Sequence, residues 1–265
     1  MESMIAVDFL AKLDSERRKA GESFLQGTLV KEYSADGLEC TVVYSHCTSD
    51  EIRQVIQKEA SVAETSKYVL EWKVYDHDTP DNLKRELVLA GFEPSLRESV
   101  MFLRLSNSAL GAFDGPAYDI RRIRDPKHLA DVAAISHEVG RSNVADETRR
   151  LGLMLEKSPQ SIGIYVAYID SEAVACGRLH INENSEIAEL SGGRTKTKHR
   201  KHGLYRALVR IRLMEAIRRS CKYAFVDALP TSEAILNKRG FEFLVQTQPF
   251  LYRPKSVKGE SLARL

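Results

Sequence analysis

The chain has 265 residues, of which 43% are hydrophobic and 29% charged, with 15 Gly and 8 Pro. This composition is typical of a folded globular protein and excludes disordered, collagen-like and disulfide-rich classes. The sequence has no apolar run long enough to span a membrane, and its first twenty residues mix charged with apolar positions, unlike a secretory signal. The four cysteines lack CxxC spacing. We therefore expect reduced thiols and a cytoplasmic protein that does not bind membranes.

The net charge of +2 hides an uneven distribution along the chain. Residues 1–117 carry 13 Lys and Arg against 20 Asp and Glu, a net charge of −7. Residues 118–265 carry 26 against 17, a net charge of +9. The basic second half favours an anionic ligand there. Attraction between the two halves explains the same distribution, and the two explanations are compatible.

Residues 1–26 have apolar positions at helical spacing and predict an amphipathic helix. The chain then becomes strand-like, and Ser34–Gly37 has the composition of a hairpin turn. Ser49 is the expected N-cap of the next helix, and Pro80 the first residue of the one after it. Residues 106–117, rich in Gly and Ser, predict a linker. The other predicted elements of this half are helices over 50–64 and 79–90 and strands over 38–45, 68–75 and 98–105.

After the linker, the predicted order is strand, two helices, three strands, helix, strand, helix and a final pair of strands. These elements lie at 118–123, 126–139, 146–157, 163–169, 172–181, 186–194, 203–220, 223–229, 232–238 and 241–252. Gly-Phe-Glu follows a helix and precedes a strand in both halves, within 87–93 and within 236–242. The repetition predicts two related domains, 1–110 and 118–265.

Several common catalytic motifs are absent from the sequence. It contains no P-loop, no GxGxxG, no HExxH and no GxSxG pattern. His199 and His202 are the only histidines near ligand spacing, and their basic loop disfavours a cation. We therefore expect no metal, and we interpret Asp76–Asp78 as a polar turn rather than as metal ligands.

Residues 185–210 carry the most informative pattern. A strand ends at Gly192 and Gly193, a basic loop follows, and a helix begins near Gly203. The N–H groups and the dipole at the start of that helix favour an anion, and glycine lets a phosphate approach the backbone. Further positive charge comes from Lys198, Arg200 and Lys201.

The segment Arg200–Tyr205 resembles the pyrophosphate-binding loop of the GNAT superfamily of N-acetyltransferases. It matches Q/R-x-x-G-x-G/A at all but the last position, and Lys201 stands where a small residue is common. Supporting residues are Ala188-Glu189-Leu190 before the loop and Ser232, Ile235-Leu236 and Gly240-Phe241 after it. The resemblance implies an α/β (α+β) fold of two tandem acyl-CoA N-acyltransferase-like domains, each a mixed, mostly antiparallel sheet flanked by helices. Residues 1–110, with their N-terminal helix, would be a degenerate copy, and 118–265 the domain that binds acetyl-CoA.

The same resemblance implies acetyl-CoA as co-substrate, with its pyrophosphate on the backbone amides of the loop. The implied binding residues are Ser191, Gly192, Gly193, Lys198, His199, Arg200, Lys201, His202, Gly203, Leu204 and Tyr205. Glu189 is the candidate general base, because an amine must be neutral to attack a thioester. Its alternative role is a solvent-facing carboxylate or the partner of an arginine. Ser232 is the candidate proton donor to the leaving thiolate, and its alternative role is an ordinary N-cap.

The resemblance implies an N-acetyltransferase that moves the acetyl group of acetyl-CoA to a primary amine by direct attack in a ternary complex. A non-catalytic module that binds acyl-CoA for regulation is the alternative. The basic run 196–202 also suggests a nucleic-acid adaptor, but it lacks interleaved aromatic residues, so we do not expect nucleic-acid binding. The expected partner is a small-molecule or peptide amine. A monomer is favoured over a homodimer, because tandem domains can supply the packing that single domains obtain by pairing.

Overall fold

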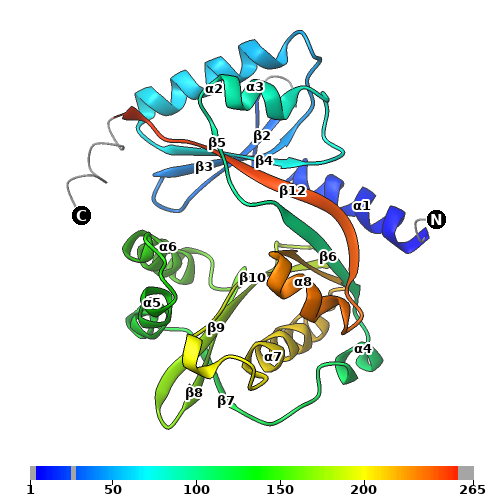
Figure 1. The fold of residues 1–265 in the computed structure, drawn as a ribbon, viewed down its shortest axis with the longest axis vertical. Helices are drawn as coiled ribbons and strands as arrows, with labels where there is room; N and C mark the ends of the chain where they lie inside the picture. Colours follow the sequence, from blue (N-terminus) through cyan, green and yellow to red (C-terminus); the bar gives the residue numbers. More distant parts are fainter. Residues whose placement is uncertain (1–3, 25–27, 256–265) are drawn as a thin grey trace. The chain divides into compact units, whose positions relative to one another are not determined.

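The structure, a computed structural model, describes residues 4–24 and 28–255 (Figure 1). The chain forms two compact units. Unit 1 comprises Met1–Val100 together with Leu244–Leu265, and unit 2 comprises Met101–Phe243. The expected domains 1–110 and 118–265 differ from these units, because the chain changes unit within a strand at Val100 and again at Phe243.

Unit 1 contains a sheet in the order β1-β2-β3-β4-β12, with β5 paired to β12. β3 and β4 are parallel and are joined by α2, while the other recorded pairs are antiparallel. Its described elements are α1 (Met4–Arg17), β1 (Glu22–Phe24), β2 (Leu29–Tyr33), β3 (Glu39–Ser45), α2 (Ile52–Ser66), β4 (Val69–Tyr75), α3 (Leu83–Leu89), β5 (Glu93–Pro94), the start of β6 (Glu98–Arg104) and most of β12 (Glu242–Tyr252).

Several predicted boundaries in unit 1 are wrong. The first helix ends at Arg17, and residues 22–24 form a strand instead of its last turn. At the start of α2, Thr48 has the capping role that was expected of Ser49. Its Oγ1 accepts a hydrogen bond from the Glu51 N–H at 3.3 Å, and the Glu51 carboxylate accepts hydrogen bonds from the Thr48 N–H and hydroxyl. Helix α3 begins at Leu83 rather than at Pro80.

The final pair of strands predicted at 241–252 is a single strand, β12. It pairs antiparallel with β4 from Thr247 to Tyr252, so the end of the chain completes the sheet of unit 1. A long-range pairing of this kind leaves no local pattern in the sequence, and the Gly-Phe-Glu repeat pointed to the second domain instead.

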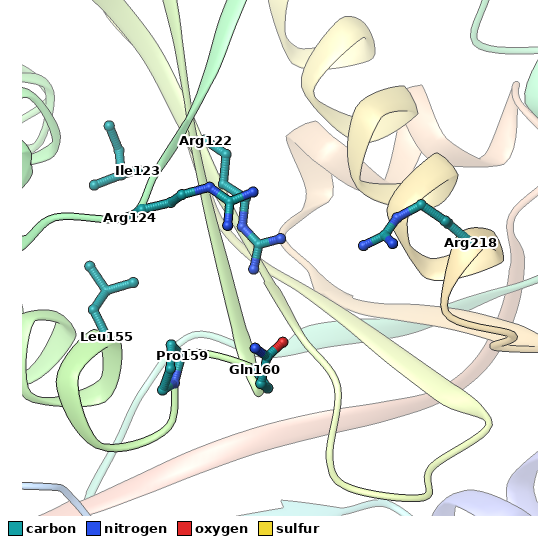
Figure 2. A pocket seen from close by; sticks show the side chains of 7 residues that line it. All are labelled: Arg122, Ile123, Arg124, Leu155, Pro159, Gln160 and Arg218. Carbon is teal, nitrogen blue, oxygen red and sulfur yellow. The ribbon is translucent and has the colours of Figure 1, made fainter.

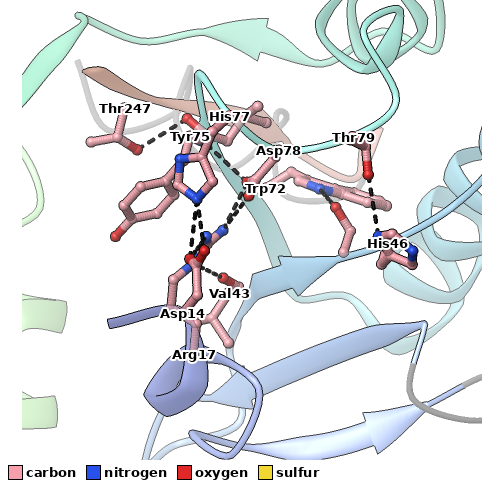
Figure 3. Close-up of polar contacts among 12 residues, drawn as sticks. Asp14, Arg17, Val43, His46, Trp72, Tyr75, His77, Asp78, Thr79 and Thr247 are labelled. Atoms are coloured by element: carbon pink, nitrogen blue, oxygen red, sulfur yellow. Dashed lines mark hydrogen bonds and ion pairs between the residues drawn. The ribbon is translucent and has the colours of Figure 1, made fainter. Parts of the chain in front are cut away.

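Arg17 anchors α1 to the sheet of unit 1 (Figure 3). Its Nε donates to the Val43 carbonyl at 2.9 Å, and its Nη2 donates to both carboxylate oxygens of Asp78 at 2.9 and 2.7 Å. Its Nη1 donates to Asp14, which also lies 2.9 Å from Nε2 of His77. The turn expected at 76–78 therefore uses its polar side chains to bind a helix.

Unit 2 contains a sheet in the order β6-β11-β10-β9-β8-β7. Its elements are the end of β6, α4 (Asn107–Gly111), β7 (Asp119–Ile123), a 3₁₀ turn η2 (Pro126–His128), α5 (Leu129–Glu138), α6 (Val144–Lys157), β8 (Ile162–Ile169), β9 (Glu172–His180), β10 (Ile187–Thr195), a second 3₁₀ turn η3 (Thr197–His199), α7 (Leu204–Arg218), β11 (Tyr223–Ala228) and α8 (Pro230–Asn237). The order predicted for 118–238 is the order observed.

Helices cover both faces of this sheet (Figure 1). On one face, α7 packs against β8–β11, with Leu208 and Leu213 fully buried beside Ala188 and Leu190. On the other face, α5 and α6 pack against alternate residues of the same strands, including Ile164. The sheet therefore has two hydrophobic cores and presents successive residues of each strand to different helices.

The segment predicted as a linker, 106–117, belongs to unit 2. Ser106 caps α4 by accepting from the Ala109 N–H at 3.1 Å. Phe113 is 1% exposed and packs edge-on against Phe241, with ring centroids 6.1 Å apart. The Gly and Ser content of the segment reflects tight turns around a buried aromatic anchor.

Candidate active site

The strand β10 changes its pairing at the point where the sequence turns to glycine. It pairs parallel with β11 from Ile187 to Glu189, and antiparallel with β9 from Glu189 to Thr195. The register with β9 shifts between Ser191 and Arg194, and Gly192 has a φ of +58°. This bulge takes the intervening peptide groups out of the recorded ladder with β9. In the described part of the chain, Ser191 Oγ is a buried atom without a hydrogen-bond partner.

The backbone at the start of α7 has features that could hold an anion. Gly203 has a φ of +88°, a conformation that favours glycine, and a Cβ there would lie no closer than 3.5 Å to a neighbouring heavy atom. The Ala207 N–H donates to the Gly203 carbonyl at 3.0 Å. The N–H groups of residues 204–206 precede this bond and therefore have no partner within the helix. They point out of its positive end.

The basic side chains of the loop divide into two groups. Lys196 and Lys198 both bind Glu172, each at 2.9 Å, and their hydrogen bonds lower the pKa of that carboxyl to about 2. Arg200 is exposed and donates from Nε to the Thr195 carbonyl at 3.2 Å. Lys198 was expected at the anion site, but the structure directs it to Glu172. Exposed positive charge near the start of α7 also comes from Arg200 and Lys201.

Tyr205 does not extend into the loop. A Cβ on Gly193 would lie 3.0 Å from the Tyr205 ring, so the ring rests on the bulge of β10 and packs against the core on the α7 face. A second tyrosine, Tyr118, donates from its hydroxyl to the His202 carbonyl and holds the loop in place. The bulky residue at the last position of the loop motif is thus accommodated by glycine on the neighbouring strand.

Glu189 lies on the face of the sheet that α5 and α6 cover. Ala188 and Leu190 belong to the core under α7, so alternation along the strand turns Glu189 to the opposite side. It is half-buried and stands opposite His180 of β9 in the register. Burial, with the positive charge of Arg178, lowers the pKa of His180 to about 4. His180 is therefore neutral at pH 7.

A second carboxylate, Asp227, shares this face of the sheet. It lies two residues beyond Phe225, the residue that pairs with Glu189, and its neighbours Val226 and Ala228 belong to the core under α7. Asp227 escaped the sequence analysis because its relation to Glu189 depends on the β10–β11 register. The sequence offered one local signal for it, because Asp227 is a single acidic residue near the end of the otherwise apolar strand β11.

An ion cluster fixes the adjoining helix. Glu147 of α6 binds Arg178 at 2.7 Å and Arg194 at 2.6 Å. Arg194 also donates to Ser136 of α5. Burial alone would raise the pKa of Glu147, but the two arginines lower it to about 2. The cluster ties α5 and α6 to the strands that flank the bulge.

Ser232 lies in the first turn of α8. Its hydroxyl donates to the Leu229 carbonyl at 2.9 Å. This local bond is typical of serine near the start of a helix. This bond gives Ser232 a role within the turn, and its expected role as proton donor stays a prediction.

Among the described residues, no group of three or more His, Cys, Asp or Glu side chains could hold a metal ion. In the same part of the chain, no helix is both long and apolar enough to cross a bilayer.

No protein-family model and no curated protein matches this sequence. Solved structures do match it. A conserved protein of unknown function from Staphylococcus epidermidis superposes with a TM-score of 0.65 at 11% identity, over 88% of this chain and 94% of that one. A GCN5-related N-acetyltransferase from Kribbella flavida gives a TM-score of 0.63 at 15% identity, over 94% and 96% of the two chains. The fold is that of the GNAT acetyltransferases.

The GNAT fold is present here in tandem form. A tandem GNAT protein from the clavulanic acid biosynthesis pathway superposes with a TM-score of 0.60 at 13% identity, over 82% of this chain and 75% of that one. The expectation of two tandem acyl-CoA N-acyltransferase-like domains is therefore confirmed at the level of the fold. A fold hosts many functions, so the chemistry depends on the residues that this chain places in its site.

Proposed function

We propose that unit 2 is an N-acetyltransferase that moves the acetyl group of acetyl-CoA onto a primary amine. The observation that carries the proposal is the start of α7, where Gly203 adopts a φ of +88° directly after a basic loop and beside the bulge of β10. The N–H groups at the start of α7 fit a pyrophosphate, and Arg200 and Lys201, which are close in the chain, add positive charge.

The bulge of β10 suits the thioester end of the same molecule. Ser191 Oγ is buried there and lacks a partner among the described residues, as expected of a polar atom that meets a ligand. The peptide groups of Gly192 and Gly193 lie outside the recorded pairing, and an N–H group there can donate to a developing oxyanion. Acetyl-CoA supplies an activated acyl carbon and a thiolate leaving group.

Glu189 is the proposed general base. It takes a proton from the acceptor ammonium, directly or through water, so that the nitrogen lone pair can attack. The new C–N bond forms as the C–S bond breaks, the thiolate leaves with the electron pair, and the second proton of the nitrogen passes to the thiolate or to solvent. A thiolate is stable enough to leave without a dedicated acid, which agrees with the local bond of Ser232.

The charges on the α5–α6 face favour a cationic acceptor. Glu189 and Asp227 both lie on this face, while His180 is neutral at pH 7. These features support a small-molecule or peptide amine as partner. The described cysteines are free and buried, which supports a reducing compartment, and we place the enzyme in the cytoplasm as a monomer.

The test is turnover. The chain is mixed with acetyl-CoA and a panel of primary amines, and free CoA thiol and acetylated amine are measured. We expect amine-dependent CoA release, and Glu189→Gln should lower kcat about 10²–10⁴-fold. Glu186→Gln is the matched control, since Glu186 pairs with Lys222, and it should keep full activity. An unchanged rate in Glu189→Gln would remove Glu189 as the base.

The alternative function is a non-catalytic module that binds acyl-CoA. The observation that favours it is Lys201, which lies in the loop with a φ of +67° where a small residue is common. Binding of acetyl-CoA without CoA release on any amine would select this alternative.

A further inference from the structure

A cavity lies in unit 2, at the end of α7 away from Gly203 (Figure 2). It has a volume of about 200 Å³ and is lined by Arg122, Arg124, Leu155, Pro159, Gln160 and Arg218, among others. At a rise of about 1.5 Å per residue, α7 places Arg218 roughly 20 Å from the anion site at its start. The cavity is therefore separate from the candidate active site.

Positive charge dominates this cavity. Arg218 donates to Glu215 from Nε at 2.9 Å and from Nη2 at 2.7 Å, and Arg122 Nη1 reaches the same carboxylate at 3.3 Å. One carboxylate thus serves two guanidinium groups. Arg124 is exposed and, among the described residues, has no hydrogen-bond or ion-pair partner. Three guanidinium groups therefore share a single compensating charge.

The fork geometry of arginine suits oxyanions. Each guanidinium can donate two parallel hydrogen bonds to a phosphate or a carboxylate. Figure 2 shows Arg122 and Arg124 entering from one side, Arg218 facing them from α7, and the Gln160 amide pointing between them. Donors from several directions match a tetrahedral anion better than a planar one, whose oxygens lie in one plane.

The size of the cavity limits the ligand. Pockets for drug-sized ligands and cofactors occupy about 300–1,000 Å³, whereas this one has about 200 Å³. We propose that the Arg122–Arg124–Arg218 cavity binds a small phosphate-type oxyanion, either inorganic phosphate or the phosphoryl group of a small ester. Such a ligand joins β7, the segment after α6 and the end of α7, so its binding stabilises unit 2.

The test measures binding to the full chain by calorimetry at constant ionic strength. The probes are inorganic phosphate, glycerol 3-phosphate, glycerol and malonate. We expect saturable binding of phosphate, no binding of glycerol, and malonate weaker by about tenfold. Tighter binding of glycerol 3-phosphate than of phosphate identifies an ester as the ligand, and equal or weaker binding identifies inorganic phosphate. Malonate that binds as well as phosphate overturns the assignment to a tetrahedral anion.

Arg124→Gln is the decisive variant, because the described structure gives this side chain no bond to lose. It should weaken phosphate binding about tenfold or more, as expected for one charge-assisted contact. Lys58→Gln, on an exposed position of α2, removes the same charge from unit 1 and should leave binding unchanged. Equal weakening in both variants, or none in Arg124→Gln, overturns the proposal. Acetyl-CoA turnover is not used, so this result is independent of the proposed function.

Discussion

Glu189 of β10 and His180 of β9 lie opposite each other in the strand register. Burial, helped by the charge of Arg178, keeps His180 neutral at pH 7 with a pKa of about 4. A neutral imidazole therefore lies beside the proposed base. This arrangement suits a carboxylate that must accept a proton.

The depressed pKa of His180 predicts a loss of stability in acid. The unfolded chain protonates this side chain near pH 6.5, whereas the folded chain does so only near pH 4, so stability falls as pH falls through this window. At pH 5 the loss from His180 is at most about 2 kcal/mol. Urea unfolding at pH 7 and pH 5 should show a smaller difference for His180→Gln than for the wild type. The same difference in both proteins would contradict this explanation.

At the residue scale, the loop motif could be predicted from the sequence. The residues that the fold brings near the site from distant parts of the chain could not. Arg200 to Gly203 form a local pattern, and glycine at a positive φ is a direct consequence of that pattern. Asp227 joins Glu189 only through the strand register. Lys198 points to Glu172 because an acid distant in sequence lies near it in the fold, which spacing does not reveal.

At the scale of elements, one carboxylate links the helix α6 to the sheet of unit 2. Glu147 is 9% exposed and compensates two arginines, one on β9 and one on β10. It therefore connects the helix to both strands that border the bulge.

Loss of this carboxylate should weaken unit 2. Glu147→Gln leaves Arg178 and Arg194 without their counter-charge and should cost about 3 kcal/mol of unfolding free energy. Glu156→Gln, at an exposed position on the same helix, should cost less than about 0.5 kcal/mol. Urea unfolding followed by circular dichroism measures both. Similar costs for the two variants would show that the cluster contributes no special stability.

Elements with strong local patterns agree with the sequence analysis, and those defined by distant partners do not. The hairpin at Ser34–Gly37 and the helix α7 were predicted from turn residues and apolar spacing, and both are present. Residues 22–24 form a strand only because β2 lies beside them. β12 likewise depends on β4, and the paired residues of these two strands are more than 170 positions apart in the sequence.

On the scale of the whole molecule, the chain returns to unit 1 after completing unit 2. Phe250 is 2% exposed and belongs to the core of unit 1, although it lies near the end of the sequence. Unit 1 therefore needs the chain as far as Tyr252 to complete its sheet.

Truncation after Phe243 should destabilise unit 1 selectively. It removes the part of β12 that pairs with β4 and takes Phe250 out of the core. Hydrogen exchange should then accelerate in β3 and β4 and much less in β8 and β9. Truncation after Lys255 leaves β12 intact and is the control. Unchanged exchange in β4 after the first truncation would contradict the unit boundaries.

The central claim is that unit 2 binds acetyl-CoA at the start of α7. The most direct measurement is thermal unfolding with and without about 1 mM acetyl-CoA, with ATP at equal concentration as the polyanion control. If the ligand is near 100 times its Kd, the gain is roughly 2.7 kcal/mol, or about 5–10 °C.

We expect a rise of that size with acetyl-CoA but not with ATP. Gly203→Ala should abolish the rise, because alanine disfavours a positive φ. Gly37→Ala, at a φ of +72° in the hairpin of unit 1, carries a similar strain and should keep it. The absence of a rise in the wild type, or an equal rise with ATP, would contradict the claim.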